Sequence, residues 1–312
     1  MQQRFRITTR THDHPTAPSM CGQPLWDLAV VGEADEIDAR SIAACNYSCA
    51  NASTSLTLRF DSSLNEIRVN GEVARFGRLC TFLTGLSRVL IEATTLTFPE
   101  ILYVVAAAIK ANVDQLRFVY VEPIDYRRRI EGRLCDRRDF DLSDNRRYQS
   151  IPMFQTNLTE TIAGRAVFFV GYEGARLGQA LEQEEVLQRW HKHVVFGVPA
   201  FESGWEVDAM ANNVQHIGQE DQVQYAAAAS ADAAYTLLCR LRHQDKEGDP
   251  VLVAPLGTKP HAIGASLFLI EYDSMDQAIL LYDHPTRSKG RSEDIRRWHF
   301  YDVVDTLPRQ TI

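Results

Sequence analysis

The chain repeats one pattern twice, and this internal repetition constrains its fold more than any other sequence feature. Residues 90–102 read LIEATTLTFPEIL, and residues 251–263 read VLVAPLGTKPHAI. With Pro99 placed on Pro260, an apolar strand, a threonine-bearing turn and the start of a helix align in the two segments. A strand–turn–helix unit that occurs twice predicts two similar α/β domains with a ligand site between them.

The flanking segments extend the repetition in both directions. Upstream, LAVVGE (28–33) and VFFVGYE (167–173) each place a buried type of strand before a glycine turn. Downstream, FVYVEP (118–123) corresponds to ILLYDHP (279–285) after an insertion of one residue. A helix packed on a parallel strand also recurs for purely structural reasons, so an α/β fold without duplication is the alternative.

The length of the chain and the alternation of its elements predict the domain organisation. A chain of 312 residues suits two domains of about 150 residues each. Strands that alternate with helices predict an α/β fold of two tandem Rossmann-like domains with mainly parallel sheets, related by the internal pseudo-repeat. We expect domain 1 at residues 24–126 and domain 2, including a last strand, at residues 164–312. Residues 1–23 are polar and predict a flexible N-terminal arm, and residues 127–163 predict an Arg-rich linker or surface excursion.

Composition and charge argue against several classes of protein. The net charge of −8 disfavours a general nucleic-acid binder, although eight arginines within residues 127–147 leave direct binding through that segment open. No apolar run approaches the ~18 residues that span a membrane, and the N-terminus lacks the apolar region of a secretory signal. We therefore expect a soluble cytoplasmic protein. The six cysteines lack CxxC pairing and no HExxH motif occurs, so we expect no metal and no cofactor.

The turn LGTKP (256–260) is the sharpest candidate for a binding site. In open α/β sheets, ligands bind beyond the carboxyl ends of the strands. Gly257 allows a close backbone approach, Thr258 can cap the helix or contact a ligand oxygen, and Lys259 adds its charge to the positive helix N-terminus. Together they predict an anion cradle. An ordinary threonine N-cap followed by a solvated lysine is the alternative.

A second candidate turn, GYEGAR (171–176), follows the first strand of domain 2. Gly171 supports a tight turn, and Arg176 starts a helix near the position of a bound phosphate. Glu173 can accept a hydrogen bond from a base or a ribose. The alternative is that Glu173 and Arg176 form an exposed pair at the start of the helix.

The matching turn in domain 1 offers hydroxyl groups and no lysine. Phe98 stands at the position that Lys259 has in domain 2, and the hydroxyls belong to Thr94, Thr95 and Thr97. A site built from both turns would have one charged wall and one hydroxyl wall. A plain helix-capping cluster is the alternative for the three threonines.

These segments resemble the CRISPR-associated Rossmann-fold (CARF) sensor domains and the related SAVED domains of prokaryotic antiviral signalling. In CARF domains a strand ends in a Gly/Thr/Lys turn that opens a helix, as VLVAPLGTKPHAIGASLF (251–268) does here. The first CARF strand ends in a glycine-containing ligand loop, to which FVGYEG (169–174) is similar, and RVLIEATTLTFPEI (88–101) resembles a Thr-rich variant of the turn. The ligand contacts that this resemblance implies are Gly171, Glu173, Gly257, Thr258 and Lys259.

The resemblance also implies a function. SAVED domains resemble two such units fused in one chain, and here no effector nuclease, protease or helix-turn-helix is recognisable. The expectation is a sensor that binds a nucleotide-type anionic ligand and signals to a separate effector protein in antiviral defence. One alternative is a nucleotide-processing enzyme of the phosphodiesterase or ring-nuclease type, with Thr258 or Lys259 orienting a phosphate. The other is a structural subunit of a defence or DNA-processing complex, and oligomerisation is compatible with all three.

Overall fold

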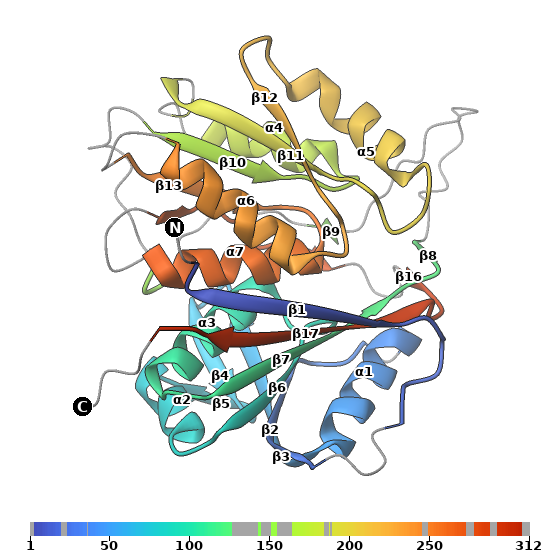
Figure 1. Cartoon of the computed structure of the whole chain (residues 1–312), viewed down its shortest axis with the longest axis vertical. Coiled ribbons are helices and arrows are strands. Elements are labelled where there is room, and N and C mark those ends of the chain that lie inside the picture. Colours follow the sequence, from blue (N-terminus) through green and yellow to red (C-terminus); the bar gives the residue numbers. More distant parts are fainter. Residues whose placement is uncertain are drawn as a thin grey trace. The chain divides into compact units, whose positions relative to one another are not determined.

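The chain folds into two compact α/β units, and the central strands of both main sheets are parallel (Figure 1). Unit 1 comprises Met1–Asp125 and Ser292–Ile312, and unit 2 comprises Tyr126–Arg291. The computed structural model describes residues 3–19, 24–35, 37–126, 143–144, 151–154, 164–183, 187, 189–244, 249–272, 278–287 and 292–307.

Unit 1 is built on one sheet of eight strands. In spatial order these are β1 (Phe5–His12), β17 (Arg297–Asp305), β7 (Gln115–Glu122), β6 (Arg88–Glu92), β2 (Trp26–Val31), β3 (Ala52–Asp61), β4 (Glu66–Val69) and β5 (Glu72–Ala74). The four central strands, from β7 to β3, are parallel, and the outer strands on both sides are antiparallel. The helices described in this unit are α1 (Ala39–Ala50), α2 (Phe76–Leu83) and α3 (Phe98–Lys110).

The apolar pattern explains how the central strands and helices of unit 1 pack. β2 is a nearly continuous apolar run, which suits a strand covered on both faces. On one face, Ala44 and Tyr47 of α1 pack against Trp26 and Trp298. α3 is buried along nearly its whole length and carries Pro99 in its first turn, where a missing N–H costs nothing.

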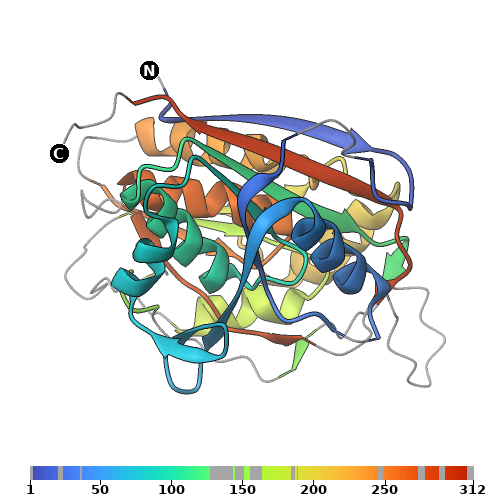
Figure 2. The same ribbon diagram turned by 90° about the horizontal axis from the view of Figure 1, so that it is seen from below.

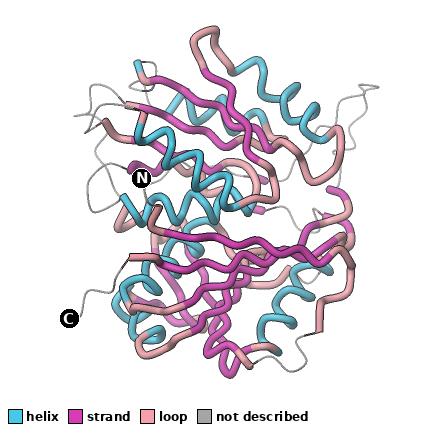
Figure 3. The backbone as a smooth tube through the Cα atoms, in the orientation of Figure 1, coloured by secondary structure: helices cyan, strands magenta, loops and turns pink. Residues whose placement is uncertain are grey.

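Unit 2 is built on a parallel sheet of five strands (Figure 3). In spatial order these are β12 (Gln222–Ala226), β11 (His191–Gly197), β10 (Arg165–Phe169), β13 (Val251–Pro255) and β14 (Ala278–Leu280). The helices described in this unit are α4 (Gly174–Gln183), α5 (Trp205–Asn213), the 3-10 helix η3 (Val214–His216), α6 (Ala231–His243) and α7 (Lys259–Tyr272). A short ladder in this unit pairs β9 (Ser143–Asp144) with β15 (Thr286–Arg287). A further ladder pairs β8 (Asp125–Tyr126) with β16 (Ser292–Glu293), and of these residues only Tyr126 belongs to unit 2.

In both main sheets the strand order reverses beside one central strand, which is β2 in unit 1 and β10 in unit 2. In unit 2 the chain runs from β10 to β11 and β12 on one side, and then crosses to β13 and β14 on the other side. In unit 1 it runs from β2 to β3 on one side, and crosses to β6 and β7 on the other. Each reversal leaves two adjacent parallel strands whose following loops diverge, which is the usual place for a ligand in such sheets.

The expected flexible N-terminal arm is wrong for residues 5–12, which form the edge strand β1. β1 pairs along its whole length with β17 near the opposite end of the chain, as Figure 2 shows. For the same reason the last strand belongs to unit 1, whereas we expected it in the second domain. Its neighbours are β1 and β7, so a reading that follows chain order assigns it to the wrong unit.

The expected Arg-rich linker lies mostly outside the described residues. The eight arginines of residues 127–147 all fall there, so the prediction that they lie on the surface stays a prediction. Within the same segment, the side chains of Ile151 and Phe154 are buried. A surface excursion is therefore wrong for these two residues, because buried apolar side chains contribute to a core.

Candidate functional site

The sheet of unit 2 brings two loops together at the carboxyl ends of β10 and β13. The two strands are adjacent and parallel, and Phe169 is paired with Pro255 where they end. The chain then leaves β10 toward β11 and leaves β13 toward β14, on opposite sides. The loops at this switch point are residues 170–173 and 256–258, which contain four of the six residues of unit 2 expected to bind a ligand.

Two glycines allow the backbones of these loops to touch. A Cβ atom built on Gly171 would lie 3.6 Å from Gly257 Cα, so the two predicted glycines are neighbours. A Cβ atom on Gly257 would lie 2.9 Å from the carbonyl oxygen of Val170, which is closer than real Cβ contacts. Glycine at position 257 is therefore required by the packing of the two loops, whether or not a ligand is bound.

The N-terminus of α7 combines a threonine cap with a lysine. Thr258 Oγ1 accepts a long hydrogen bond of 3.4 Å from the His261 amide, and the Thr258 carbonyl accepts one of 3.0 Å from Ala262. The same hydroxyl donates to the carbonyl of Ala228 at 2.8 Å. Of the two roles open to Thr258, the structure shows the cap. Lys259, the first residue of α7, is half-buried at the same helix end.

Arg176 has a structural role in unit 2. Its guanidinium Nε and Nη2 each lie 2.6 Å from an oxygen of Asp283, and Nη1 donates to the carbonyl of Leu256. Burial alone lowers the pKa of Arg176, but the Asp283 carboxylate outweighs this effect and raises the pKa. Arg176 thereby ties α4 to the loop after β13 and to the segment after β14. Its predicted contact with a ligand stays untested.

An aromatic cluster adjoins the loop after β10. The ring of Tyr172 lies 5.6 Å from that of Trp205 and 6.2 Å from that of Tyr126, measured between centroids. The side chain of Asn212 donates to the Tyr172 carbonyl at 2.9 Å and fixes this loop. Trp205 is buried, while Tyr172, Tyr126 and the neighbouring Glu173 are partly accessible. Partly exposed tyrosine rings are suited to stacking with a base.

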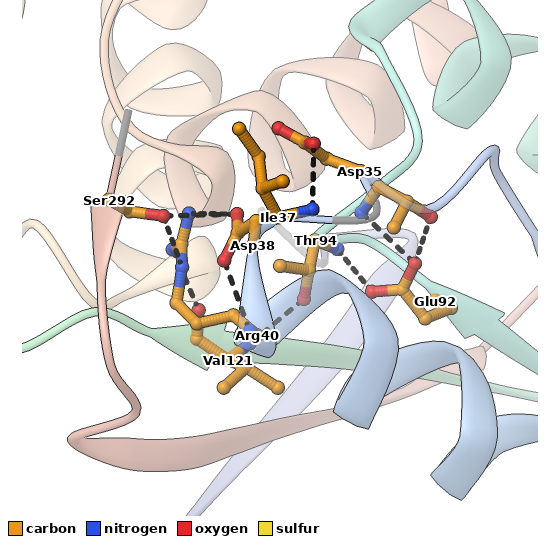
Figure 4. A network of polar contacts seen from close by, with 9 residues as sticks. Asp35, Ile37, Asp38, Arg40, Glu92, Thr94, Val121 and Ser292 are labelled. Carbon is orange, nitrogen blue, oxygen red and sulfur yellow. Dashed lines mark hydrogen bonds and ion pairs between the residues drawn. The ribbon is translucent and has the colours of Figure 1, made fainter. Parts of the chain in front are cut away.

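In unit 1 the corresponding loop is filled by a carboxylate of the protein itself (Figure 4). Glu92 accepts hydrogen bonds from the amides of Thr94 at 2.6 Å and Thr95 at 3.0 Å, and from the Thr95 hydroxyl. Thr95 Oγ1 in turn accepts from the Gly32 amide at 2.9 Å. Burial and Glu92 raise the pKa of the nearby Cys45 thiol to about 12, so it stays protonated. These contacts favour a buried capping cluster over the expected hydroxyl wall at Thr94 and Thr95.

The start of α1 adds a second internally satisfied network at this edge of unit 1. Asp38 caps α1 by accepting from the Arg40 amide at 3.0 Å. Arg40 also donates to Ser292 Oγ at 3.0 Å, to the Val121 carbonyl at 3.1 Å and to Asp38 at 3.2 Å (Figure 4). Burial alone raises the pKa of Asp38, but the charge and hydrogen bonds of Arg40, with a hydrogen bond from Ser292, outweigh it and lower the pKa.

The two helices that follow the switch-point turns therefore differ in electrostatics. At the start of α3, Glu100 accepts hydrogen bonds from the amides of Thr97 and Phe60, so this positive helix end is already paired with a carboxylate. Neither the loop 256–258 nor the first turn of α7 contains an acidic residue, and Lys259 adds a full positive charge there. Of these two helix ends, the start of α7 is the better suited to an external anion.

Sequence reasoning missed Asp38, Arg40, Glu92 and Ser292. An aspartate before a helix is a known N-cap signal, and Asp38 was detectable on that basis. Glu92 ends an apolar strand just before a threonine-rich turn, which is also a local signal. Ser292 reaches Arg40 from a segment far along the chain, so no local pattern indicates it.

No protein-family model and no curated protein matches this chain. The site must therefore be interpreted from its own geometry. Among the described residues, no three His, Cys, Asp or Glu side chains are grouped as metal ligands. None of the helices in the described part of the chain is long and apolar enough to cross a membrane.

A cavity of about 660 Å³ lies at the opposite end of the unit 2 strands. Lys192, at the start of β11, and Asp221, just before β12, line it and form an ion pair of 3.2 Å. His216 and Gly218 also line the cavity. Because ligands of open α/β sheets bind at the carboxyl ends of strands, we place the candidate site at the switch point and not in this cavity.

Proposed function

We propose that unit 2 binds a nucleotide-type anionic ligand at the carboxyl ends of β10 and β13. The observation that carries the proposal is the start of α7, where Gly257, Thr258 and Lys259 lead into a helix whose first turn contains no acidic residue. A phosphate there would meet the charge of Lys259, the helix dipole and the first-turn amides together. Tyr172 and Tyr126, beside the adjoining loop, offer ring faces for a base.

We further propose that the two units are Rossmann-like domains related by internal duplication. In support, β6–α3–β7 and β13–α7–β14 are both strand–helix–strand units. In unit 1, β6 lies next to the first central strand β2 and β7 lies beyond it; in unit 2, β13 lies next to β10 and β14 lies beyond it. Pro99 and Pro260 are the second residues of α3 and α7. Under this proposal unit 1 keeps the framework of the site but has Glu92 and Glu100 where a ligand's charge would lie.

The proposed setting is antiviral defence in the cytoplasm of a prokaryote, with a separate effector protein as the recipient of the signal. This part follows from the resemblance of the segments 169–174 and 251–268 to CARF and SAVED domains. In such a system, ligand binding has to change the affinity for the effector, because a signal is a difference in free energy between two states.

Binding of a ligand panel by wild type and Lys259→Ala tests the proposal. The panel contains mononucleotides and both linear and cyclic oligonucleotides. A charge-assisted contact to phosphate contributes roughly 1.5–3 kcal/mol, so Lys259→Ala should weaken binding by about 10- to 150-fold. Lys192→Ala is the matched control, because it removes the same charge from the opposite end of the same sheet and should bind normally.

Each outcome decides between functions. Binding without turnover, weakened selectively by Lys259→Ala, supports the sensor. Formation of a product from any nucleotide supports a processing enzyme. If no member binds to wild type, or if Lys259→Ala binds as well as wild type, the sensor proposal is wrong and a structural subunit takes its place.

A further inference from the structure

Three side chains on neighbouring strands of unit 1 have the arrangement of an activated nucleophile. Thr11 Oγ1 on β1 lies 3.2 Å from His299 Nδ1 on β17. His299 Nε2 lies 2.7 Å from Glu122 Oε2 on β7. Both distances fall within the reach of about 2.6–3.2 Å found between a nucleophile, its base and the group that orients the base.

The carboxylate sets the direction of the hydrogen bonds. An ionised carboxylate only accepts, so His299 Nε2 carries the proton and donates it to Glu122. In the neutral form of His299 the lone pair is then on Nδ1, which faces Thr11 Oγ1. The Thr11 hydroxyl therefore donates to His299, and this is the direction that proton removal by a general base requires.

The imidazole of His299 is held in one orientation. Its ring is stacked with Tyr120 and Tyr301, at centroid distances of 6.0 Å and 6.3 Å. Only 2% of His299 is exposed. Burial, together with Glu122, raises the pKa of Tyr301 well above its ordinary value, so this phenol stays neutral beside the imidazole.

Glu122 has the countercharge that a buried carboxylate needs. Only 1% of the residue is exposed, and its Oε1 lies 3.5 Å from Arg297 Nε and 3.7 Å from Arg296 Nε. Oε1 accepts no hydrogen bond among the described residues, so the hydrogen bond to His299 through Oε2 is its strongest directional contact. Removing one partner of such a buried set is costly, which keeps the geometry fixed.

Thr11, unlike its two partners, is exposed to solvent. It lies on β1, the outermost strand of the described sheet, whose outer side faces no other described strand. Alternate backbone amides of an edge strand point outward. Either the Thr11 amide or those of Arg10 and His12 are thus placed to donate to a developing oxyanion beside Thr11.

We propose that Thr11 is the nucleophile of an acyl-transfer site in unit 1 that accepts carboxylic esters. Thr11 Oγ forms a bond to the ester carbonyl carbon while His299 Nδ1 takes the hydroxyl proton. The bond from that carbon to the alkoxy oxygen breaks, and the leaving oxygen departs with the electron pair and receives the proton from His299. Water then releases the acid from the acyl-threonine by the same route. Glu122 is a positioning residue that fixes the tautomer of His299.

The test is acylation of the full chain by 4-nitrophenyl acetate. We expect a burst of 4-nitrophenolate and an acetyl group on Thr11, mapped by peptide mass spectrometry. Thr11→Ala should abolish the burst and Thr11→Ser should keep it. Glu122→Gln should slow acylation by about 100-fold or more, because an amide can donate to Nε2 and hold the wrong tautomer.

Thr9 provides the matched control, because it lies two residues away on the same strand and is also exposed, but is paired with Tyr301 in place of a histidine. Thr9→Ala should acylate like wild type. Circular dichroism checks that each variant is folded. If Glu122→Gln does not fold, the comparison of Thr11→Ser with Thr11→Ala still tests the proposal. The proposal is overturned by absence of the acetyl group from Thr11 in wild type, by loss of the burst in Thr9→Ala, or by full-speed acylation in folded Glu122→Gln.

Discussion

At the scale of single residues, Arg176 shows how the fold can use a charge that sequence reasoning assigns to a ligand. Its guanidinium is buried, pairs with Asp283 through two atoms at 2.6 Å and also donates to the Leu256 carbonyl. A lysine or arginine that only contacts a ligand leaves stability nearly unchanged when removed. Arg176 should behave differently from Lys259, because its removal leaves the Asp283 carboxylate buried without a countercharge.

We predict that Arg176→Ala lowers the free energy of unfolding by about 3–5 kcal/mol, as expected for breaking a buried ion pair. A denaturant titration that follows the unfolding of unit 2 measures this loss of stability. The control is Arg78→Ala, which removes an arginine from an exposed pair with Glu72 and should cost less than about 1 kcal/mol. Equal losses in the two variants would contradict the structural role of Arg176.

His261 gives unit 2 a predictable dependence on pH. Burial lowers its pKa from 6.5 to about 4, and its Nε2 lies 3.1 Å from the Ala227 carbonyl. As the pH falls, the unfolded chain gains the proton near pH 6.5, whereas the folded chain gains it only near pH 4. The unfolded state binds more protons in this window, so stability falls from about pH 6.5 to about pH 4 and the loss levels off below it.

At about 1.36 kcal/mol per pKa unit, the expected loss from His261 is about 3 kcal/mol. Urea titrations across this pH range measure it. His261→Gln is the control, since a glutamine can still donate to the Ala227 carbonyl but does not titrate in this range. A variant whose stability falls with pH as steeply as that of wild type would show that His261 is not the cause.

At the scale of elements, α6 and α7 pack with their backbones in contact. A Cβ atom on Gly264 of α7 would lie 2.9 Å from Ala234 Cβ and from the Tyr235 amide nitrogen, and closer still to the Ala231 carbonyl. Backbone atoms of a packed helix cannot yield as the end of a flexible side chain can. The usual preference of helices for alanine over glycine is therefore outweighed here by overpacking.

We predict that Gly264→Ala destabilises the protein by about 1–3 kcal/mol. The matched control is Gly77→Ala in α2, where a Cβ atom would meet nothing within 4 Å. That change should be neutral or stabilise by up to about 1 kcal/mol, because alanine restricts the unfolded chain. Thermal unfolding of both variants tests whether stability falls in Gly264→Ala and is kept or rises in Gly77→Ala. Destabilisation of equal size in both variants would contradict the packing argument.

At the scale of the whole molecule, unit 1 is assembled from the two ends of the chain. β17 lies between β1 and β7, so the last described strand completes a sheet that begins with the first. Trp298 and Phe300 of β17 also belong to the core around α1. Unit 2 is continuous in sequence and contains none of these residues.

We predict that truncation after residue 291 disrupts unit 1 and spares unit 2. Without β17, β1 has no described partner and β7 loses one neighbour. Hydrogen exchange should show lost amide protection at 5–12 and 115–122, and retained protection at 165–169 and 251–255. A peptide of residues 292–307 added back should restore protection in β7. Undisturbed exchange at 115–122 after truncation would contradict this assembly.

The sequence by itself determined the local elements, namely individual strands and the starts of helices. Apolar runs before Gly32 and Gly171 predicted buried strands, and the prediction that Pro99 and Pro260 lie at helix starts is confirmed. These features depend on periodicity and on the fixed φ of proline, which act over a few residues. The closeness of Gly171 and Gly257, which the structure shows, agrees with the rule that ligand-binding loops lie at a switch point.

Only the tertiary structure decided what each charged group does. The pairing of β1 with β17, the ion pair of Arg176 with Asp283 and the closing of the Thr94 turn by Glu92 all depend on neighbours in space. The first two join residues far apart in the sequence, which no local periodicity encodes. Glu92 is close by, but only burial forces a carboxylate to take its hydrogen bonds from the backbone amides around it, because leaving that charge unpaired costs several kcal/mol.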